Sequence, residues 1–160
     1  MNILITGCAG FIGFHLSKYI LDNSKHQVFG IDNLNEYYDL KLKKDRLKIL
    51  KKKSKKFNFK KIDITKYQIL NNNFKKDKYH VIIHLAAQAG VRHSINKPKT
   101  YFQNNLLGFF NILDLAKQYN LKHFIYASTS SVYGKNINFP LKENSSTDKP
   151  LSFYAATKKS

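Results

Sequence analysis

Two residues near the end of the chain have types and a spacing that suit proton transfer. Tyr154 and Lys158 are four positions apart, so a helix would place both on one face, with the lysine ammonium close to the phenol. A free tyrosine has a pKa of about 10, and nearby positive charge is needed before a phenol acts as a base at neutral pH. Such pairs also occur by chance on exposed helices. The pair therefore predicts a general base only if other parts of a site accompany it.

A cluster of hydroxyl groups precedes this pair along the chain. Ser128, Thr129, Ser130 and Ser131 follow an apolar run from Lys122 that predicts a strand. Open α/β sheets bind ligands at the carboxyl ends of their strands. The cluster therefore indicates where a substrate could meet hydroxyl groups.

The first 13 residues predict a strand, a tight turn and the start of a helix. Asn2 to Thr6 is a short apolar run, and Gly7, Gly10 and Gly13 follow it. In a dinucleotide-binding turn, the first glycine allows a sharp bend, the second the close approach of a pyrophosphate, and the third close packing of helix on strand. The same glycines could form an ordinary strand-to-helix turn. An acidic residue about 20 positions later favours the dinucleotide site.

Asp32 occupies that position, at the carboxyl end of the next predicted strand. A carboxylate there can accept hydrogen bonds from both ribose hydroxyls of an adenosine but would repel a 2′-phosphate, which favours NAD over NADP. Asn33 supplies no positive charge that would offset this repulsion. Without its context, Asp32 could equally be a turn or cap residue.

Strand-like and helix-like segments alternate along the whole chain. The predicted strands are Asn2 to Thr6, Gln27 to Asp32, Phe57 to Ile62, Tyr79 to Leu85 and Lys122 to Ser128. The predicted helices are Phe11 to Asn23, Glu36 to Lys56, Thr65 to Lys75 and Pro98 to Tyr119. This alternation predicts an α/β fold with a doubly wound parallel sheet of the Rossmann type.

The helix patterns also predict which residues are buried. In the first helix the expected apolar face is Phe11, Ile12, Leu16, Tyr19 and Ile20. The lysine-rich second helix is expected to be mostly solvated, with Leu40, Leu47 and Leu50 toward the sheet. Thr65 is expected to cap the third helix.

Composition narrows the class of protein. The 160 residues are 42% hydrophobic, which suits one globular domain. The net charge of +18 could indicate a nucleic-acid or membrane surface, but the lysines are spread along the chain and no nucleic-acid recognition motif occurs. The only cysteine, Cys8, fits a small space in the glycine turn. No basic leader or membrane-length apolar run occurs, so we expect a cytoplasmic protein with no membrane partner, no nucleic-acid partner and no metal site.

Five stretches resemble the extended short-chain dehydrogenase/reductase family, and most of all its UDP-glucuronate 4-epimerases. They are TGCAGFIG from Thr6, DNLNEYYDLKLKKDRL from Asp32, HLAAQAGVRHS from His84, STSSVYG from Ser128 and YAATKKS from Tyr154. One position departs from the family pattern, because His93 stands where a tyrosine is usual.

The resemblance implies a role for each residue type. Tyr154 would be the catalytic base, Lys158 would hold the nicotinamide ribose and tune Tyr154, and Thr129 would bond the reacting sugar hydroxyl. The implied NAD site comprises Gly7, Gly10, Phe11, Ile12, Gly13, Asp32, Asn33, Asp63, Ile64, Leu85, Ala86, Ala87, Gln88, Asn105, Tyr154 and Lys158. The implied substrate site comprises Arg92, Thr129, Ser130, Ser131 and Tyr154.

The implied reaction is the epimerisation of UDP-glucuronate to UDP-galacturonate at C4. Tyr154 would remove the proton of the 4-hydroxyl while hydride passes from C4 to NAD, and the 4-keto sugar would be reduced on its other face. Ser130 and Ser131 stand where related nucleotide-sugar dehydratases carry Asp-Glu. Hydroxyls there would accommodate a substrate carboxylate better than two acids.

The family's members have about twice this length. Residues 1–160 would therefore be an incomplete NAD-binding Rossmann domain, truncated after the fifth strand and the start of the catalytic helix, without the substrate domain. The full-length protein is expected to be a homodimer. The alternatives are a non-catalytic NAD-binding fragment, a related nucleotide-sugar dehydratase and, from another class, a basic nucleic-acid-binding domain.

Overall fold

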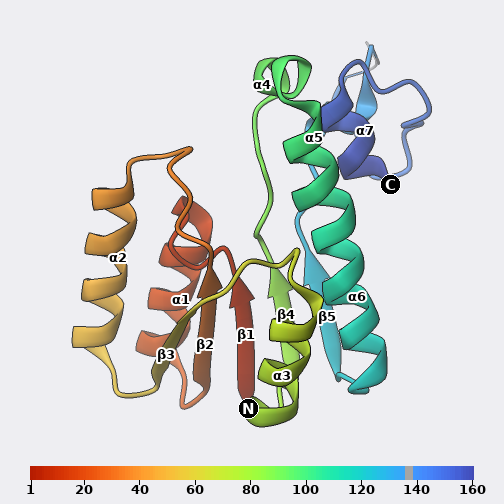
Figure 1. The fold of residues 1–160 in the computed structure, drawn as a ribbon. Coiled ribbons are helices and arrows are strands. Elements are labelled where there is room, and N and C mark those ends of the chain that lie inside the picture. Colours follow the sequence, from red (N-terminus) through yellow and green to blue (C-terminus); the bar gives the residue numbers. More distant parts are fainter. Residues whose placement is uncertain (136–138) are drawn as a thin grey trace.

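A five-stranded parallel sheet forms the centre of the computed structural model, which describes residues 1–135 and 139–160 (Figure 1). The spatial order is β3-β2-β1-β4-β5, and every neighbouring pair is parallel. The strands are β1 (Asn2–Thr6), β2 (Gln27–Asp32), β3 (Phe57–Lys61), β4 (Val81–His84) and β5 (His123–Tyr126). The predicted doubly wound Rossmann sheet is confirmed, with β3, β4 and β5 shorter than expected.

Helices cover both faces of this sheet (Figure 1). One hydrophobic cluster joins the β1 residues Ile3 and Ile5 to α1 (Phe11–Asn23) and α2 (Leu40–Lys53). The other joins Leu4 to α3 (Tyr67–Asp77) and α6 (Gly108–Gln118). Successive side chains of a strand point to opposite faces, so the apolar run of β1 supports both layers.

The predicted apolar face of α1 is only partly confirmed: Leu16 and Ile20 pack against the hydrophobic cluster, but the other three predicted residues do not. The buried residues of this helix are Gly13, Phe14 and Ser17, while Phe11, Ile12 and Tyr19 are exposed. A Cβ added to Gly13 would lie 2.2 Å from the Gly7 carbonyl oxygen, so the helix can pack this closely only through a glycine. The Ser17 hydroxyl donates to the Gly13 carbonyl at 2.6 Å. Two small residues, Gly13 and Ser17, therefore lie with Phe14 on the face that meets the sheet.

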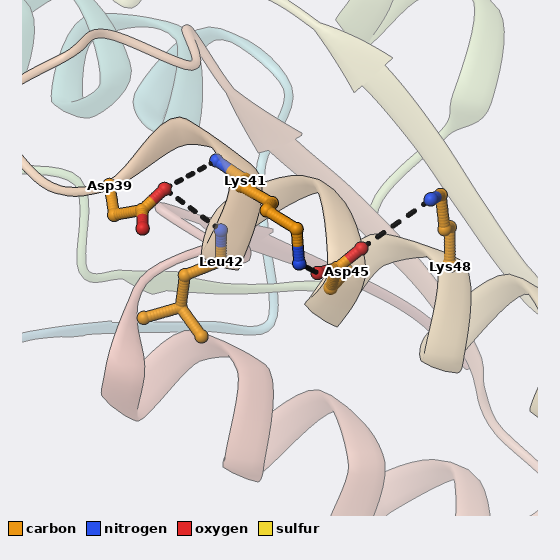
Figure 2. A network of polar contacts seen from close by, with 5 residues as sticks. All are labelled: Asp39, Lys41, Leu42, Asp45 and Lys48. Carbon is orange, nitrogen blue, oxygen red and sulfur yellow. Dashed lines mark hydrogen bonds and ion pairs between the residues drawn. The ribbon is translucent and has the colours of Figure 1, made fainter.

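The second helix begins at Leu40 rather than Glu36, because Asp39 caps it. The Asp39 carboxylate accepts hydrogen bonds from the backbone N–H groups of Lys41 (2.7 Å) and Leu42 (3.3 Å), as Figure 2 shows. Asp45 pairs with Lys41 and Lys48 on the exposed surface of the helix. Exposed pairs of this kind contribute little to stability.

The third helix begins at Tyr67, and Thr65 does not cap it. The residue at the cap position, Lys66, makes no side-chain cap bond. The Thr65 hydroxyl instead donates to the Asp63 carboxylate at 2.8 Å. The Thr65 hydroxyl, which was predicted to cap the helix, is therefore bonded within the local turn.

The predicted helix from Pro98 to Tyr119 is interrupted by one wide turn. Its parts are α5 (Pro98–Tyr101), the π-helical segment η1 (Phe102–Leu107) and α6, and Pro98 occupies the first turn as expected. A short helix that was not predicted, α4 (Val91–Asn96), precedes it. π-Helical turns occur frequently at functional sites.

Two short elements lie beyond the carboxyl ends of the strands. They are the 3-10 helix η2 (Ser130–Tyr133) and α7 (Phe153–Lys159), which carries Tyr154 and Lys158 and lies near α4 and α5 (Figure 1). In the part of the chain that the structure describes, no helix has the length and apolarity needed to cross a bilayer.

Candidate functional site

A cavity of about 420 Å³ opens where β1, β2 and β4 end. Most of the predicted cofactor residues line it: Gly7, Gly10, Phe11, Ile12, Gly13, Asp32, Asn33, Ile64, Leu85, Ala86, Ala87 and Gln88. Residues far apart in the sequence meet here because parallel strands end at the same edge of the sheet.

The glycine turn shapes one wall of this main cavity. Gly7 has a φ of +68°, and a Cβ there would lie 2.9 Å from the backbone nitrogen of Ala86. Gly10 precedes α1 without a side-chain cap, so the first N–H groups of the helix find no acceptor among the described residues. A helix of 13 residues that begins with free N–H groups, preceded by a turn with glycine at both ends, fits a diphosphate.

Asp32 lies beside the glycine turn and is held by two backbone N–H groups. Its carboxylate is buried and accepts hydrogen bonds from the backbone N–H groups of Ala9 (3.2 Å) and Leu34 (2.8 Å). Burial and the Asp32 charge raise the pKa of the neighbouring Cys8 thiol well above its ordinary value. The thiol is therefore protonated and fills space, as expected from its place in the turn.

Asp63 lies outside the main cavity. Its carboxylate accepts hydrogen bonds from the backbone N–H and the hydroxyl of Thr65, both at 2.8 Å. Burial raises the pKa of this carboxyl, but these hydrogen bonds outweigh burial and hold the pKa below its ordinary value. The cavity wall at this point is apolar and consists of Ile62 and Ile64.

A second cavity, of about 210 Å³, lies on the other side of Ala86 and Ala87, which line both. Lys158 lines only this smaller cavity, and burial lowers the pKa of its ammonium. His84 lines it too, and burial, together with the Lys158 charge, lowers the pKa of its imidazole to about 3. The two predicted halves of the cofactor site therefore lie in adjoining cavities.

Asn105 is held by three hydrogen bonds to other residues of the chain. Its side-chain oxygen accepts from the Gln88 N–H at 2.7 Å, and its nitrogen donates to the Gln88 carbonyl at 3.0 Å and the Thr157 hydroxyl at 3.1 Å. The residue lines the smaller cavity while joining η1 to the β4 strand end and to α7. Its position in the π-helical turn places it to hold these elements together.

The three predicted catalytic residues do not share a cavity. Neither Thr129 nor Tyr154 lines either cavity, and no hydrogen bond joins Tyr154 to Lys158 within the described residues. The Thr129 hydroxyl accepts from the Ser131 N–H at 3.3 Å, and the Tyr154 ring packs edge-on against Tyr101 at 6.0 Å. Of the predicted substrate residues, Arg92 and Ser130 are exposed, whereas Thr129, Ser131 and Tyr154 are half-buried.

A family model described as GDP-mannose 4,6-dehydratase matches residues 4–160. The chain belongs to this family.

Similar proteins cover the whole of this chain, and several of them are named as epimerases. Protein CapI of Staphylococcus aureus is 48% identical over all of this chain and 47% of its own length, and a probable UDP-glucuronate 4-epimerase of Rhizobium meliloti is 46% identical over all of this chain and 46% of its own. The crystal structure of a Bacillus cereus UDP-glucuronic acid 4-epimerase with UDP-glucuronic acid and NAD superposes with a TM-score of 0.90. It is 36% identical to this chain, and the match covers 99% of this chain and 49% of that one.

The chain spans about half the length of the curated relatives it matches. The family model is named for a dehydratase and several relatives of this chain are named as epimerases, so the names alone do not decide between epimerisation and dehydration. The site residues must decide it.

Two basic residues of the main cavity were missed by the sequence analysis. Lys43 and Arg46 line it from α2, although most of that helix was expected to be solvated. Lys43 is buried, and Arg46 donates to the Ala9 carbonyl at 3.2 Å and lies over the Phe11 ring. A spacing signal was present, because positions 43 and 46 are each four residues before a buried leucine of the same helix.

Proposed function

We propose that residues 1–160 are the dinucleotide-binding and catalytic half of an NAD-dependent UDP-glucuronate 4-epimerase. The observation that carries the proposal is the main cavity, where the free N–H groups of α1, the glycine turn and the Asp32 carboxylate face one space. Relatives crystallised with NAD and a UDP-sugar support the same cofactor and substrate class. The rest of the sugar-nucleotide site would come from sequence equivalent to the relatives' other half.

Residues of the two cavities would bind different parts of NAD. The α1 N-terminus and Gly10 would hold the diphosphate, and Asp32 would accept hydrogen bonds from the adenosine ribose. Lys158 would donate to the nicotinamide ribose. NAD, when bound, supplies a reversible hydride acceptor for C4 of the sugar.

Proton transfer at the sugar would fall to Tyr154. Its phenolate would take the proton of the 4-hydroxyl, while Thr129 orients that hydroxyl, and the phenol would return the proton after the sugar has turned. For this to happen, Tyr154, Thr129 and Lys158 must meet around one substrate. In the described residues only Lys158 lines a cavity, and we therefore expect low activity of these 160 residues alone.

The sugar would be a hexuronic acid rather than a neutral hexose. Ser130 and Ser131 follow Thr129 in the 3-10 helix η2, and their hydroxyls can donate to a carboxylate. No acidic residue stands at these two positions, which argues against elimination of water by a dehydratase mechanism.

Calorimetric titration of the purified chain with NAD, NADP, UDP-glucuronate and duplex DNA tests the proposal. We expect saturable but weak NAD binding, weaker NADP binding and little affinity for the UDP-sugar. DNA binding tighter than NAD binding would favour the basic nucleic-acid-binding alternative. No NAD binding at millimolar concentration would refute the proposed function.

A further inference from the structure

Lys43 is a buried cation in the wall of the main cavity. Its side chain extends from α2, and the residue is only 6% exposed. The ammonium donates to the backbone carbonyl of Asn35 at 2.8 Å and to the Asn35 side-chain oxygen at 2.9 Å. Within residues 1–135 and 139–160, no carboxylate lies within 4.0 Å of it. Its third N–H has no acceptor in this part of the chain.

Such an arrangement is unusual for a lysine, since buried ammonium groups are normally paired with an anion. Asn35 supplies two neutral oxygens, which satisfy part of the hydrogen bonding but none of the charge. Two carboxylates line the same cavity, and neither pairs with Lys43: Asp39 accepts from the first N–H groups of α2, and Asp32 accepts from the N–H groups of Ala9 and Leu34. The cavity therefore presents a fixed carboxylate and a fixed ammonium that do not pair with each other.

A group that fits between these two charges must both donate and accept hydrogen bonds. A ribose hydroxyl does both: its proton can go to the Asp32 carboxylate, and its oxygen can accept from the Lys43 ammonium. A phosphate can only accept in its ionised form. Asp32 would repel it, but Lys43 would attract it.

We propose that Lys43 is a specificity-determining residue for the dinucleotide, donating to an adenosine ribose hydroxyl whose proton Asp32 accepts. This inference rests on the proposed function, because it requires a dinucleotide in the main cavity. Lys43 also affects the choice between NAD and NADP, because it supplies near Asp32 the positive charge that Asn33 lacks. Asp32 and Lys43 then act in opposite directions on a 2′-phosphate, and the preference for NAD is narrower than Asp32 alone would produce.

A purely structural role for Lys43 makes a different prediction. If the residue only anchored Asn35, its loss would loosen the segment before α2 and weaken every dinucleotide equally. If it bonds a ribose hydroxyl, its loss matters only for ligands that carry that hydroxyl. Ligand analogues that lack one hydroxyl therefore separate the two roles.

The experiment measures dissociation constants of the 160-residue chain for NAD, for its adenosine 2′-deoxy and 3′-deoxy analogues, and for NADP. Lys43→Met should weaken NAD binding about tenfold, the order expected for a hydrogen bond to a charged group. For one of the two deoxy analogues, wild type and variant should agree within about twofold. Lys43→Met should also weaken NADP more than NAD. The matched control is Lys44→Met, which removes an exposed lysine of the same helix and should change nothing.

Three results separate the possible failures. Unchanged NAD binding by Lys43→Met, or an equal loss for NAD and both analogues, overturns the inference and leaves the proposed function standing. A wild-type chain that binds no NAD overturns the proposed function, and the inference with it. Circular dichroism and thermal melting check folding, and Lys43→Gln, which keeps a polar group but loses the charge, replaces the Met variant if that one does not fold.

Discussion

The main cavity, which is the proposed dinucleotide site, and the predicted catalytic region, residues 129–158, are built in different ways. The cavity walls follow directly from buried strands: Gly7 lies in close contact with the backbone of Ala86, and Asp32 is held by the N–H groups of Ala9 and Leu34. The catalytic region uses a four-residue 3-10 helix and a seven-residue α-helix, and Thr129 and Tyr154 are only half-buried.

The geometry of the two regions therefore has different sources. Close packing in the sheet determines the first region without a ligand, so it should bind part of the cofactor on its own. The second region depends on contacts such as the Asn105 bond to Thr157, and of its three predicted catalytic residues only Lys158 lines a cavity. Catalysis needs groups held to within about 0.5 Å, so this region should depend more on the rest of the protein.

The largest expected effect is on the catalytic region and needs a longer protein. In a chimera of residues 1–160 with the unmatched part of the Rhizobium meliloti relative, Tyr154→Phe should lower kcat for UDP-glucuronate about 10²- to 10⁴-fold. NAD affinity should change less than about threefold, because the main cavity does not include Tyr154. If Tyr154→Phe also lowered NAD affinity in proportion to kcat, then Tyr154 would contribute to cofactor binding and the two regions would not act independently.

The next effect is on the dinucleotide cavity. Gly13→Ala should abolish measurable NAD binding and lower the free energy of unfolding by about 2 kcal/mol, since its Cβ would overlap the Gly7 carbonyl. Gly10→Ala is the matched control for stability, because its Cβ would lie 3.1 Å from the same oxygen and should cost clearly less. Chemical denaturation and calorimetry measure both quantities. Equal stability of the two variants would contradict the packing argument.

His84 lines the smaller cavity, and its buried imidazole should make the stability of the chain depend on pH. The Thr6 hydroxyl accepts from the Leu85 and Ala86 N–H groups, so its own proton goes to His84 Nδ1 at 2.9 Å and the imidazole must be neutral. Burial and the Lys158 charge lower the folded-state pKa of His84 to about 3, below the unfolded value. The unfolded chain therefore binds the extra proton first, and stability falls as the pH drops below about 6.5.

The expected size follows from the same linkage. Between pH 6.5 and 5, His84 should account for a loss of about 2 kcal/mol in the free energy of unfolding. His84→Asn keeps an oxygen that can accept from Thr6 but cannot titrate, so its pH profile should be flatter by that amount. Identical profiles for wild type and variant in urea denaturation would rule out this role for His84.

The smallest expected effect is that of the Asp32 carboxylate on the preference for NAD over NADP. Asp32→Ala should weaken NAD binding about tenfold and weaken NADP binding less, because it removes both the ribose acceptor and the charge that repels a 2′-phosphate. Asp45→Ala, which removes an exposed carboxylate of α2, is the control. A larger loss for NADP than for NAD would contradict the placement of the ribose at Asp32.

The sequence predicted the sheet and the dinucleotide cavity because both depend on local patterns. The apolar run before Gly7 and the acid at Asp32 each have a fixed position relative to a strand end, and parallel strands then bring them together. The face of α1 could not be read from hydrophobicity, since the close approach of Gly13 to Gly7 decides it. Lys43 was missed because composition alone indicates a solvated helix, and only its spacing from Leu47 places it on the buried face.

The catalytic region was predicted as a list of residues, and the distances among them had no sequence signal. The four-residue spacing places Tyr154 and Lys158 on one helix face but does not determine what each side chain contacts. The π-helical turn at Asn105 also has no pattern of its own, because its amide bonds to residues far away in sequence.

The most direct test of the account is an amide NMR titration of the 160-residue chain with NAD. We predict saturable shifts at Gly10 to Gly13, at Asp32 and at Leu85 to Gln88, with small shifts at Thr129 and Ser131. Shifts confined to the region from Thr129 to Lys158, or no saturable shifts, would contradict the claim that the sheet alone builds the dinucleotide half of the site.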